Sequence, residues 1–152
     1  MRNFQSRNLR KGRISQPGNH YLLTAKTHNR RPVFRDLQAA RCCIRALRHQ
    51  QEAGRVNSLA FVVMPDHLHW LVELRSGNLA DVMRLVKGYV ARTINRQTGS
   101  TGPLWQSGYH DHALRSDEDL REIARYVVAN PVRAGLVESV WAYPHWDAVW
   151  VE

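Results

Sequence analysis

The 152-residue chain has no long apolar run, and this absence excludes several classes of protein. No stretch approaches the roughly 20 apolar residues of a membrane-spanning helix, so we expect no association with a membrane. The opening segment, MRNFQSRNLRKGR, is charged and has no apolar segment behind it, so it does not predict a secretory signal. The length fits one globular domain, and 43% apolar with 23% charged residues is ordinary for such a domain.

Cysteine is also scarce. The two cysteines, Cys42 and Cys43, are adjacent within a predicted helix, where they are poorly placed for a disulfide framework. This usage predicts an intracellular, reducing compartment. The sequence has no glycine-rich phosphate loop, so we expect no nucleotide cofactor.

Acidic residues are absent before Asp36, although this segment holds nine basic residues. The whole net charge of +9 therefore lies in the N-terminal quarter. A second acid-free window, between Asp81 and Asp111, contains Arg84 and Lys87. A charged segment can simply be a solvated face, but such concentration favours a polyanion, and nucleic acid more than membrane because no apolar face accompanies the charge.

Turn residues and hydrophobic periodicity divide the chain into strands and helices. Strands are expected over residues 20–27, 56–64, 67–74 and 109–114, and helices over 37–53, over about twenty residues after Asn78, and over 116–131. Without the last helix the order is β-α-β-β-α-β, that of the ferredoxin-like fold. We therefore predict an α+β fold with a four-stranded antiparallel sheet and one extra helix.

The chain divides into a basic arm over 1–18, one domain over 19–140 and a tryptophan-rich tail over 141–152. Trp141, Trp146 and Trp150 of the tail can stack on unpaired bases, but we expect the tail to pack on the domain.

The stretch MPDHLHWL places His67 and His69 on one face of a strand, because residues two apart share a face. Leu68 and Trp70 point to the other, apolar face. Two imidazoles at this spacing can converge on one divalent cation, or they can be hydrogen-bonded residues of the sheet. A third ligand has to come from elsewhere in the chain.

A rival pair, His110 and His112, occupies the strand YHDHAL. Its spacing is the same, but the intervening Asp111 is polar where Leu68 is apolar, which indicates an edge strand. Structural or DNA-facing roles are favoured for this pair.

The third helix carries a tyrosine away from its apolar stripe. Tyr126 lies roughly 130° from the centre of that stripe, and Asn130, four residues on, shares its side. Pro131 is expected to end the helix at Asn130. A phenol can attack a phosphodiester, and an amide oxygen can join two imidazoles around a metal ion; a surface tyrosine and a C-capping asparagine are the alternatives. Tyr89 is the best substitute nucleophile.

Four segments, THNRRPVF, MPDHLHWL, LWQSGYHDHAL and ARYVVANPVRAGLV, lie between residues 27 and 137. Together they resemble the REP-associated tyrosine transposases, bacterial members of the HUH-type single-tyrosine transposases that are related to insertion-sequence enzymes acting on single-stranded DNA. The resemblance implies that 19–140 is a ferredoxin-like HUH catalytic domain. It also implies Mg²⁺- or Mn²⁺-dependent cleavage and joining of single strands beside DNA hairpins, in the bacterial cytoplasm at the nucleoid.

By this resemblance Tyr126 is the nucleophile, which forms a 5′-phosphotyrosine link, and His67, His69 and Asn130 are the metal ligands. Insertion-sequence relatives have glutamine where Asn130 stands, and the shorter amide changes the reach. Hairpin recognition is expected from the basic residues Arg2, Arg7, Arg10, Lys11, Arg13, His28, Arg30, Arg31, Arg84 and Lys87.

Two other functions remain open. The same scaffold can bind a DNA hairpin without cleaving it, and a replication-initiator nickase shares the chemistry but usually adds a helicase domain. The resemblance allows a monomer or a homodimer.

Overall fold

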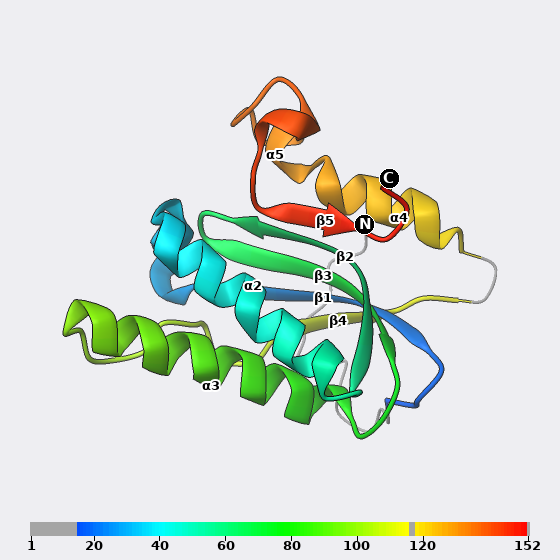
Figure 1. Ribbon diagram of the computed structural model, residues 1–152, viewed down its shortest axis with the longest axis horizontal. Coiled ribbons are helices and arrows are strands. Elements are labelled where there is room, and N and C mark those ends of the chain that lie inside the picture. Colours follow the sequence, from blue (N-terminus) through cyan, green and yellow to red (C-terminus); the bar gives the residue numbers. More distant parts are fainter. Residues whose placement is uncertain (1–14, 116–117, 152) are drawn as a thin grey trace.

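The computed structural model describes residues 15–115 and 118–151 (Figure 1). The strands are β1 (His20–Lys26), β2 (Val56–Met64), β3 (His67–Leu74), β4 (His110–Ala113) and β5 (Trp146–Ala148). The helices are α2 (Leu37–Glu52), α3 (Leu79–Thr98), α4 (Leu120–Val128) and α5 (Asn130–Arg133), with short 3-10 helices η1 (His28–Arg30), η2 (Val33–Arg35) and η3 (Val140–Ala142).

The strands form one antiparallel sheet in the order β4-β1-β3-β2-β5. The first four positions give the ferredoxin-like arrangement, so the predicted fold class is confirmed. The fifth strand differs from the prediction of four. It comes from the C-terminal tail and pairs with Ala60–Val62 of β2, and three residues are too few for a period of two to be visible in the sequence.

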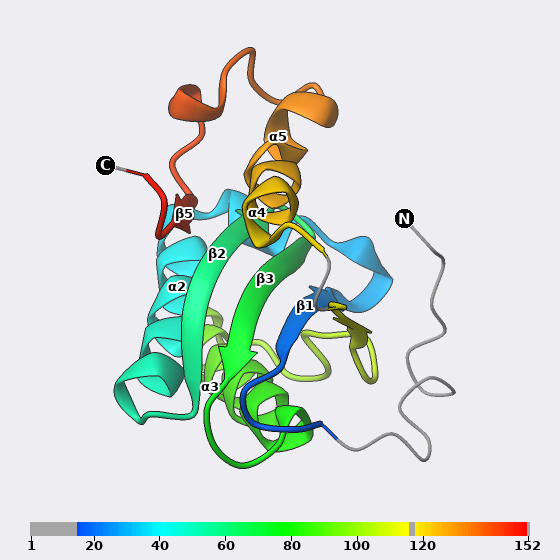
Figure 2. The ribbon, with the colours of Figure 1, turned by 90° about the vertical axis from the view of Figure 1, so that its right-hand side faces the viewer.

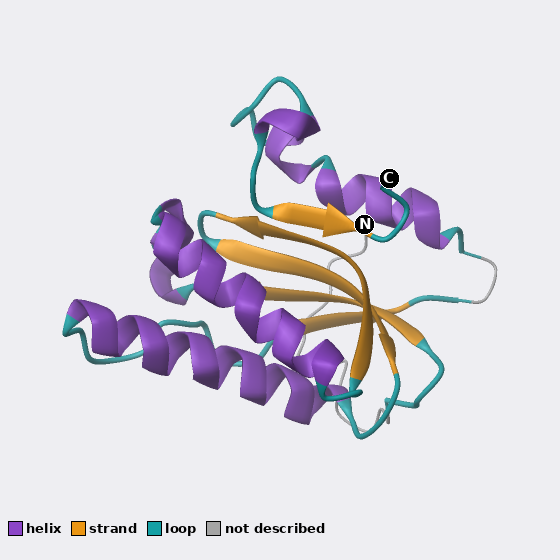
Figure 3. Ribbon diagram, viewed as in Figure 1, coloured by secondary structure: helices purple, strands orange, loops and turns teal. Residues whose placement is uncertain are grey.

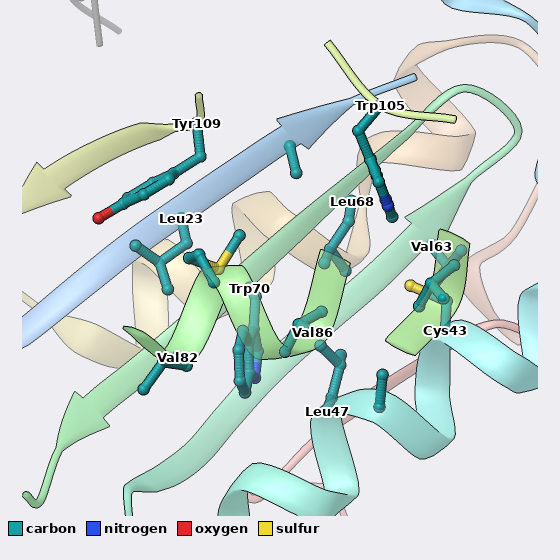
Figure 4. Close-up of a cluster of buried hydrophobic side chains, with 14 of the residues drawn as sticks. Leu23, Cys43, Leu47, Val63, Leu68, Trp70, Val82, Val86, Trp105 and Tyr109 are labelled. Atoms are coloured by element: carbon teal, nitrogen blue, oxygen red, sulfur yellow. The ribbon is translucent and has the colours of Figure 1, made fainter. Parts of the chain in front are cut away.

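Helices α2 and α3 lie side by side on one face of the sheet (Figures 1 and 3). Leu68 and Trp70 of β3 are fully buried against them, as the alternation of β3 predicts. Figure 4 shows this cluster, in which Leu47 of α2 and Val86 of α3 approach the side chains of the sheet. The Trp70 indole N–H donates to the Ser58 hydroxyl at 2.9 Å, which satisfies the polar atom of this buried ring.

The opposite face of the sheet is covered by α4 (Figure 2). Ala124 and Val127 of α4 pack on Leu71 of β3 and Val62 of β2. Tyr126 is outside this buried stripe and 44% exposed. This second cluster fixes α4 over the half of the sheet where β3 begins with two histidines.

The ends of α2 and α3 follow from their capping residues. The Asp36 side chain accepts from the Gln38 N–H to begin α2, and the Asn78 side chain accepts from the Asp81 N–H to begin α3. Gly99, at φ 68°, ends α3 in the left-handed conformation.

The third helix differs from its prediction at both ends. The predicted first residue, Ser116, lies outside the described residues, and Asp119 caps the helix through the Arg121 N–H. Pro131 does not end the helical path at Asn130: α4 ends at Val128, and α5 begins at Asn130 with Pro131 in its first turn. Proline is tolerated there because the first N–H groups of a helix have no partner within it.

The tail returns along the free edge of β2. Trp146 and Trp150 pack against the second cluster, and the Tyr143 hydroxyl donates to the Val63 carbonyl at 2.5 Å. Trp141 is 72% exposed.

Across residues 15–115 and 118–151, no helix combines the length and the apolar character needed to cross a membrane.

Candidate metal and tyrosine site

His67 and His69 project from the beginning of β3 on the face that α4 covers. The register of the sheet pairs His69 with Thr24 of β1 and Val62 of β2, so the pair lies in the middle of the sheet. The two ring centroids are 4.8 Å apart, with the planes at 81°. The His67 side chain keeps 14% of its surface exposed, so the pair is largely enclosed but still reachable.

Each imidazole uses its Nδ1 atom within the protein. His67 Nδ1 is 2.7 Å from Asp66 Oδ1, and His69 Nδ1 is 2.8 Å from Thr24 Oγ1. A partner on Nδ1 fixes the orientation of the ring and assigns the Nε2 atom to a ligand, as in protein metal sites. The Asp66 carboxylate can only accept, so His67 Nδ1 carries the proton and Nε2 is left as a lone-pair donor. The Thr24 hydroxyl can hold His69 in the same tautomer by accepting from its Nδ1.

Both histidines are held neutral. Burial lowers the pKa of His69 to about 3, and the charges of His67 and Arg133 act in the same direction. Burial also lowers the pKa of His67, and it outweighs the opposing effect of the Asp66 carboxylate. Near neutral pH the rings therefore carry lone pairs rather than extra protons, which metal coordination requires.

Tyr126 and the histidines are connected through Arg133. The Arg133 guanidinium carbon lies 3.8 Å from the centre of the Tyr126 ring, and the same charge contributes to the low pKa of His69. Asn130 opens α5, in the helical turn that leads to Arg133. The predicted nucleophile therefore shares one charged neighbour with the predicted ligand His69.

The donor set fits a divalent ion with few protein ligands. Two neutral imidazoles and an amide oxygen suit Mn²⁺ well and are compatible with Mg²⁺, provided that water or substrate oxygens complete the coordination. Among the described residues, His, Cys, Asp and Glu side chains do not gather in groups of three that could hold a metal ion. Asn130 remains the predicted third protein ligand.

The loop before α2 brings part of the predicted DNA-binding group close to the histidines. Arg30 Nε donates to Asp66 Oδ2 at 2.9 Å, so Arg30 and His67 share one carboxylate. Arg31 donates to the Pro103 carbonyl at 2.9 Å, and the His28 N–H donates to the Leu104 carbonyl. The segment 28–31 is thus an ordered basic surface beside the histidine pair.

Other predicted DNA-binding residues lie elsewhere. Arg84 and Lys87 belong to α3, on the face of the sheet away from the histidines. The Lys87 ammonium donates to the carbonyls of Gln106 and Gly108, at 2.9 and 2.7 Å, and so supports the loop before β4. The predicted contacts Arg2, Arg7, Arg10, Lys11 and Arg13 lie outside the described residues.

The rival histidines are on an edge strand, as their sequence indicates. In β4, His110 pairs with Thr24 and His112 with Leu22, so both share the face of His67 and His69 with β1 between the two pairs. His112 Nε2 lies 3.7 Å from a Glu118 oxygen. The two histidine pairs are therefore neighbours on one face rather than one cluster.

The substitute nucleophile Tyr89 is remote from His67 and His69. It belongs to α3 on the opposite face, and its ring meets His49 edge-on at 4.9 Å.

Three residues of this site were missed in the sequence: Thr24, Asp66 and Arg133. Thr24 is recognisable only from the register of β1 on β3, which a single sequence does not give. Asp66 precedes His67 directly, but its place in MPDH indicates only a turn. Arg133 meets Tyr126 because the helical path continues through α5 beyond Asn130, where the sequence predicted its end.

Comparison with known proteins identifies the family of this chain. Residues 15–130 match the family described as Transposase IS200 like, and the chain belongs to that family. Within it, the chain resembles the REP-associated tyrosine transposases. It is 29% identical over 87 residues to the REP-associated tyrosine transposase of Escherichia coli, covering 56% of this chain and 50% of that protein. A Haemophilus influenzae protein provisionally given the same name is 30% identical over 99 residues, covering 58% and 56%.

The chain thus spans about half the length of these curated relatives.

Solved structures agree on the fold. A REP-associated tyrosine transposase bound to a REP hairpin matches with a TM-score of 0.74 at 24% identity, over 96% of this chain and 82% of that one. A Deinococcus radiodurans protein provisionally described as a transposase matches with a TM-score of 0.55 at 24% identity, over 76% and 93%.

Proposed function

We propose that this protein cleaves and rejoins single-stranded DNA through a covalent link to Tyr126, with a divalent metal ion held by His67, His69 and Asn130. The family membership supports a transposase-type reaction. The observation that carries the proposal is Arg133, which stacks on an exposed tyrosine and acts electrostatically on His69. This shared cationic neighbour supports the proposal that Tyr126 and His69 act in one site.

The proposed reaction exchanges one phosphodiester for another. Tyr126 Oη attacks the phosphorus, the bond to the 3′-oxygen breaks, and the products are a 5′-phosphotyrosine and a free 3′-hydroxyl. The phenol proton is lost to solvent or a base, and the leaving oxygen gains one. A 3′-hydroxyl that attacks the phosphotyrosine restores the strand and frees Tyr126, so no nucleotide cofactor is consumed.

The protein residues have separate tasks in this scheme. Asp66 and Thr24 orient the imidazoles, and Arg133 provides positive charge beside the phenol. The chemistry that Mg²⁺ or Mn²⁺ supplies at such a site is Lewis-acid polarisation of the phosphodiester.

The proposed substrate is a single strand that carries a hairpin. A structural relative was solved bound to a REP hairpin, and this chain presents Arg30 and Arg31 beside the histidines. The net charge of +9 suits a polyanion, whose binding should weaken as salt increases.

The test is covalent capture. A 3′-end-labelled oligonucleotide with one REP hairpin and single-stranded flanks is incubated with the protein and Mn²⁺, and adducts are separated on a denaturing gel. The wild type should form an adduct, Tyr126→Phe should form none, and Tyr89→Phe should behave as the wild type. An adduct with Tyr126→Phe would contradict the assignment. Tight binding with no cleavage in any metal would instead establish the hairpin-binding alternative.

A further inference from the structure

The Asp66 carboxylate joins the basic loop, residues 28–31, to the histidine pair. Asp66 Oδ1 meets His67 Nδ1 at 2.7 Å, and Asp66 Oδ2 accepts from Arg30 Nε at 2.9 Å. The carboxylate is therefore divided between an imidazole and a guanidinium. The Arg30 side chain is 47% exposed, so it can reach a phosphate from solvent, whereas the His67 side chain is only 14% exposed.

The backbone holds this arrangement in place. The Asp66 carbonyl accepts from the N–H of Thr27 at 3.0 Å and from its hydroxyl at 3.1 Å. Thr27 is fully buried, and its hydroxyl also lies 2.8 Å from the Arg31 carbonyl. Both ends of Asp66 are therefore tied to the basic loop, the side chain through Arg30 and the main chain through Thr27.

The loop accepts an unfavourable conformation to make this contact. Asn29 and Arg30 have φ values of 55° and 52°, in the left-handed region that costs energy for residues other than glycine. Asparagine tolerates this region better than most residues, but arginine has no such advantage. The Arg30–Asp66 ion pair is one contact that can offset the cost.

Because Arg30 and His67 share the Asp66 carboxylate, a change at one residue should affect the other. A carboxylate that accepts from the Nδ1–H of a histidine makes that ring a better metal ligand. The Arg30 charge draws on the same carboxylate and lies close enough to disfavour positive charge at His67. A phosphate that engages Arg30 would relieve both effects.

We propose that Asp66 is a positioning residue that couples Arg30 to His67, so that neutralising Arg30 with DNA phosphate strengthens metal binding at the histidine pair. This coupling rests on the proposed metal site. By linkage, metal binding in turn favours the phosphate-bound state of Arg30. Metal binding at the histidine pair and phosphate binding at Arg30 thus strengthen one another.

The direct test uses Mn²⁺ alone, with no DNA, on the full chain, and measures free Mn²⁺ by electron paramagnetic resonance. Arg30→Met removes the charge but keeps an aliphatic stem, and should tighten Mn²⁺ binding about fivefold. Arg31→Met is the matched control, because Arg31 binds the Pro103 carbonyl rather than Asp66, and should change the affinity less than twofold. Asp66→Asn should weaken binding roughly tenfold.

The double variant isolates the role of the carboxylate. The effect of Arg30→Met is the logarithm of the ratio of the Mn²⁺ affinities with and without this substitution. In a protein that already carries Asp66→Asn, this effect should be less than half of its value in the wild type. Thermal unfolding confirms that each variant is folded. A metal-free readout comes from ¹⁵N NMR of the imidazoles: Arg30→Met should shift the His67 ring nitrogens, whereas Arg31→Met should not.

Equal Mn²⁺ affinity and equal His67 signals in Arg30→Met and Arg31→Met would overturn the coupling, and so would a wild type that binds no Mn²⁺. The proposed reaction is judged separately by the Tyr126 adduct. Adduct formation with no effect of Arg30 on Mn²⁺ refutes only the coupling. Intact coupling with no adduct refutes only the reaction.

Discussion

The guanidinium carbon of Arg133 lies 3.8 Å from the centre of the Tyr126 ring, so a cation covers one face of the exposed phenol. The two residues belong to the consecutive helical segments α4 and α5, seven residues apart, and so lie on the same side of the helical path. A cation at this distance attracts the π face and also favours the negative charge that develops when the phenol reacts. Arg133 is thus an additional candidate for the reaction.

Replacing Arg133 should slow the covalent step. In Arg133→Ala the rate of adduct formation at saturating oligonucleotide should fall roughly tenfold, because the phenol loses its adjacent positive charge. Arg133→Lys should recover part of the rate. Arg121→Ala, at an exposed arginine of the same helix five residues before Tyr126, is the control and should keep the wild-type rate. An Arg133→Ala protein at full rate would exclude a role for this charge.

The Thr24 hydroxyl should matter for metal binding although it is not a predicted ligand. Thr24→Val removes the partner of His69 Nδ1 while keeping the branched shape of the side chain. Mn²⁺ affinity, measured by calorimetry, should fall about tenfold. Thr24→Ser keeps the hydroxyl and should bind as the wild type. If the valine and serine variants bind Mn²⁺ equally, the hydroxyl does not orient His69.

The Tyr143 hydroxyl should make stability depend on pH in alkaline solution. Burial raises the pKa of Tyr143 to about 12, above the value of about 10 for a tyrosine in an unfolded chain. Between these values the unfolded chain loses this proton and the folded chain keeps it, so the free energy of unfolding decreases as pH rises from about 10 to 12. Tyr143→Phe removes this contribution.

The measurement is urea unfolding at pH 8 to 11 for the wild type and Tyr143→Phe. At pH 8 the variant should be less stable by about 1 kcal/mol, because the hydrogen bond to the Val63 carbonyl is lost. The difference should shrink above pH 10. A difference that stays constant to pH 11 would show that Tyr143 ionises normally in the folded protein.

Local patterns were sufficient to predict much of this structure. Strand β3 has the predicted bounds, and its alternation correctly separates the histidine face from the Leu68 and Trp70 face. The position of Tyr126 off the apolar stripe also follows from helical periodicity alone, and the residue is exposed. These features depend on neighbours within one strand or one helix.

Two of the features that were not predicted depend on contacts between distant segments. The hydrogen bond between Thr24 and His69 spans 45 residues, and the Arg30–Asp66 ion pair spans 36. No periodicity within a single segment reports such pairings. Arg133 is only seven residues from Tyr126, but it was missed because Pro131 was expected to end the helix at Asn130, whereas the helical path continues through α5.

The hairpin between β2 and β3 limits the insertions and deletions that this protein can accept. Met64 and His67 are paired residues, so only Pro65 and Asp66 form the connection. Inserting or deleting one residue in β3 after this connection would turn the following side chains to the other face of the sheet. His67 and His69 would then lie on different faces of the sheet, or both would point into the apolar core. Length changes should therefore be rejected here and tolerated in exposed loops such as residues 99–103, so that related chains differ in loop length while keeping this hairpin at two residues.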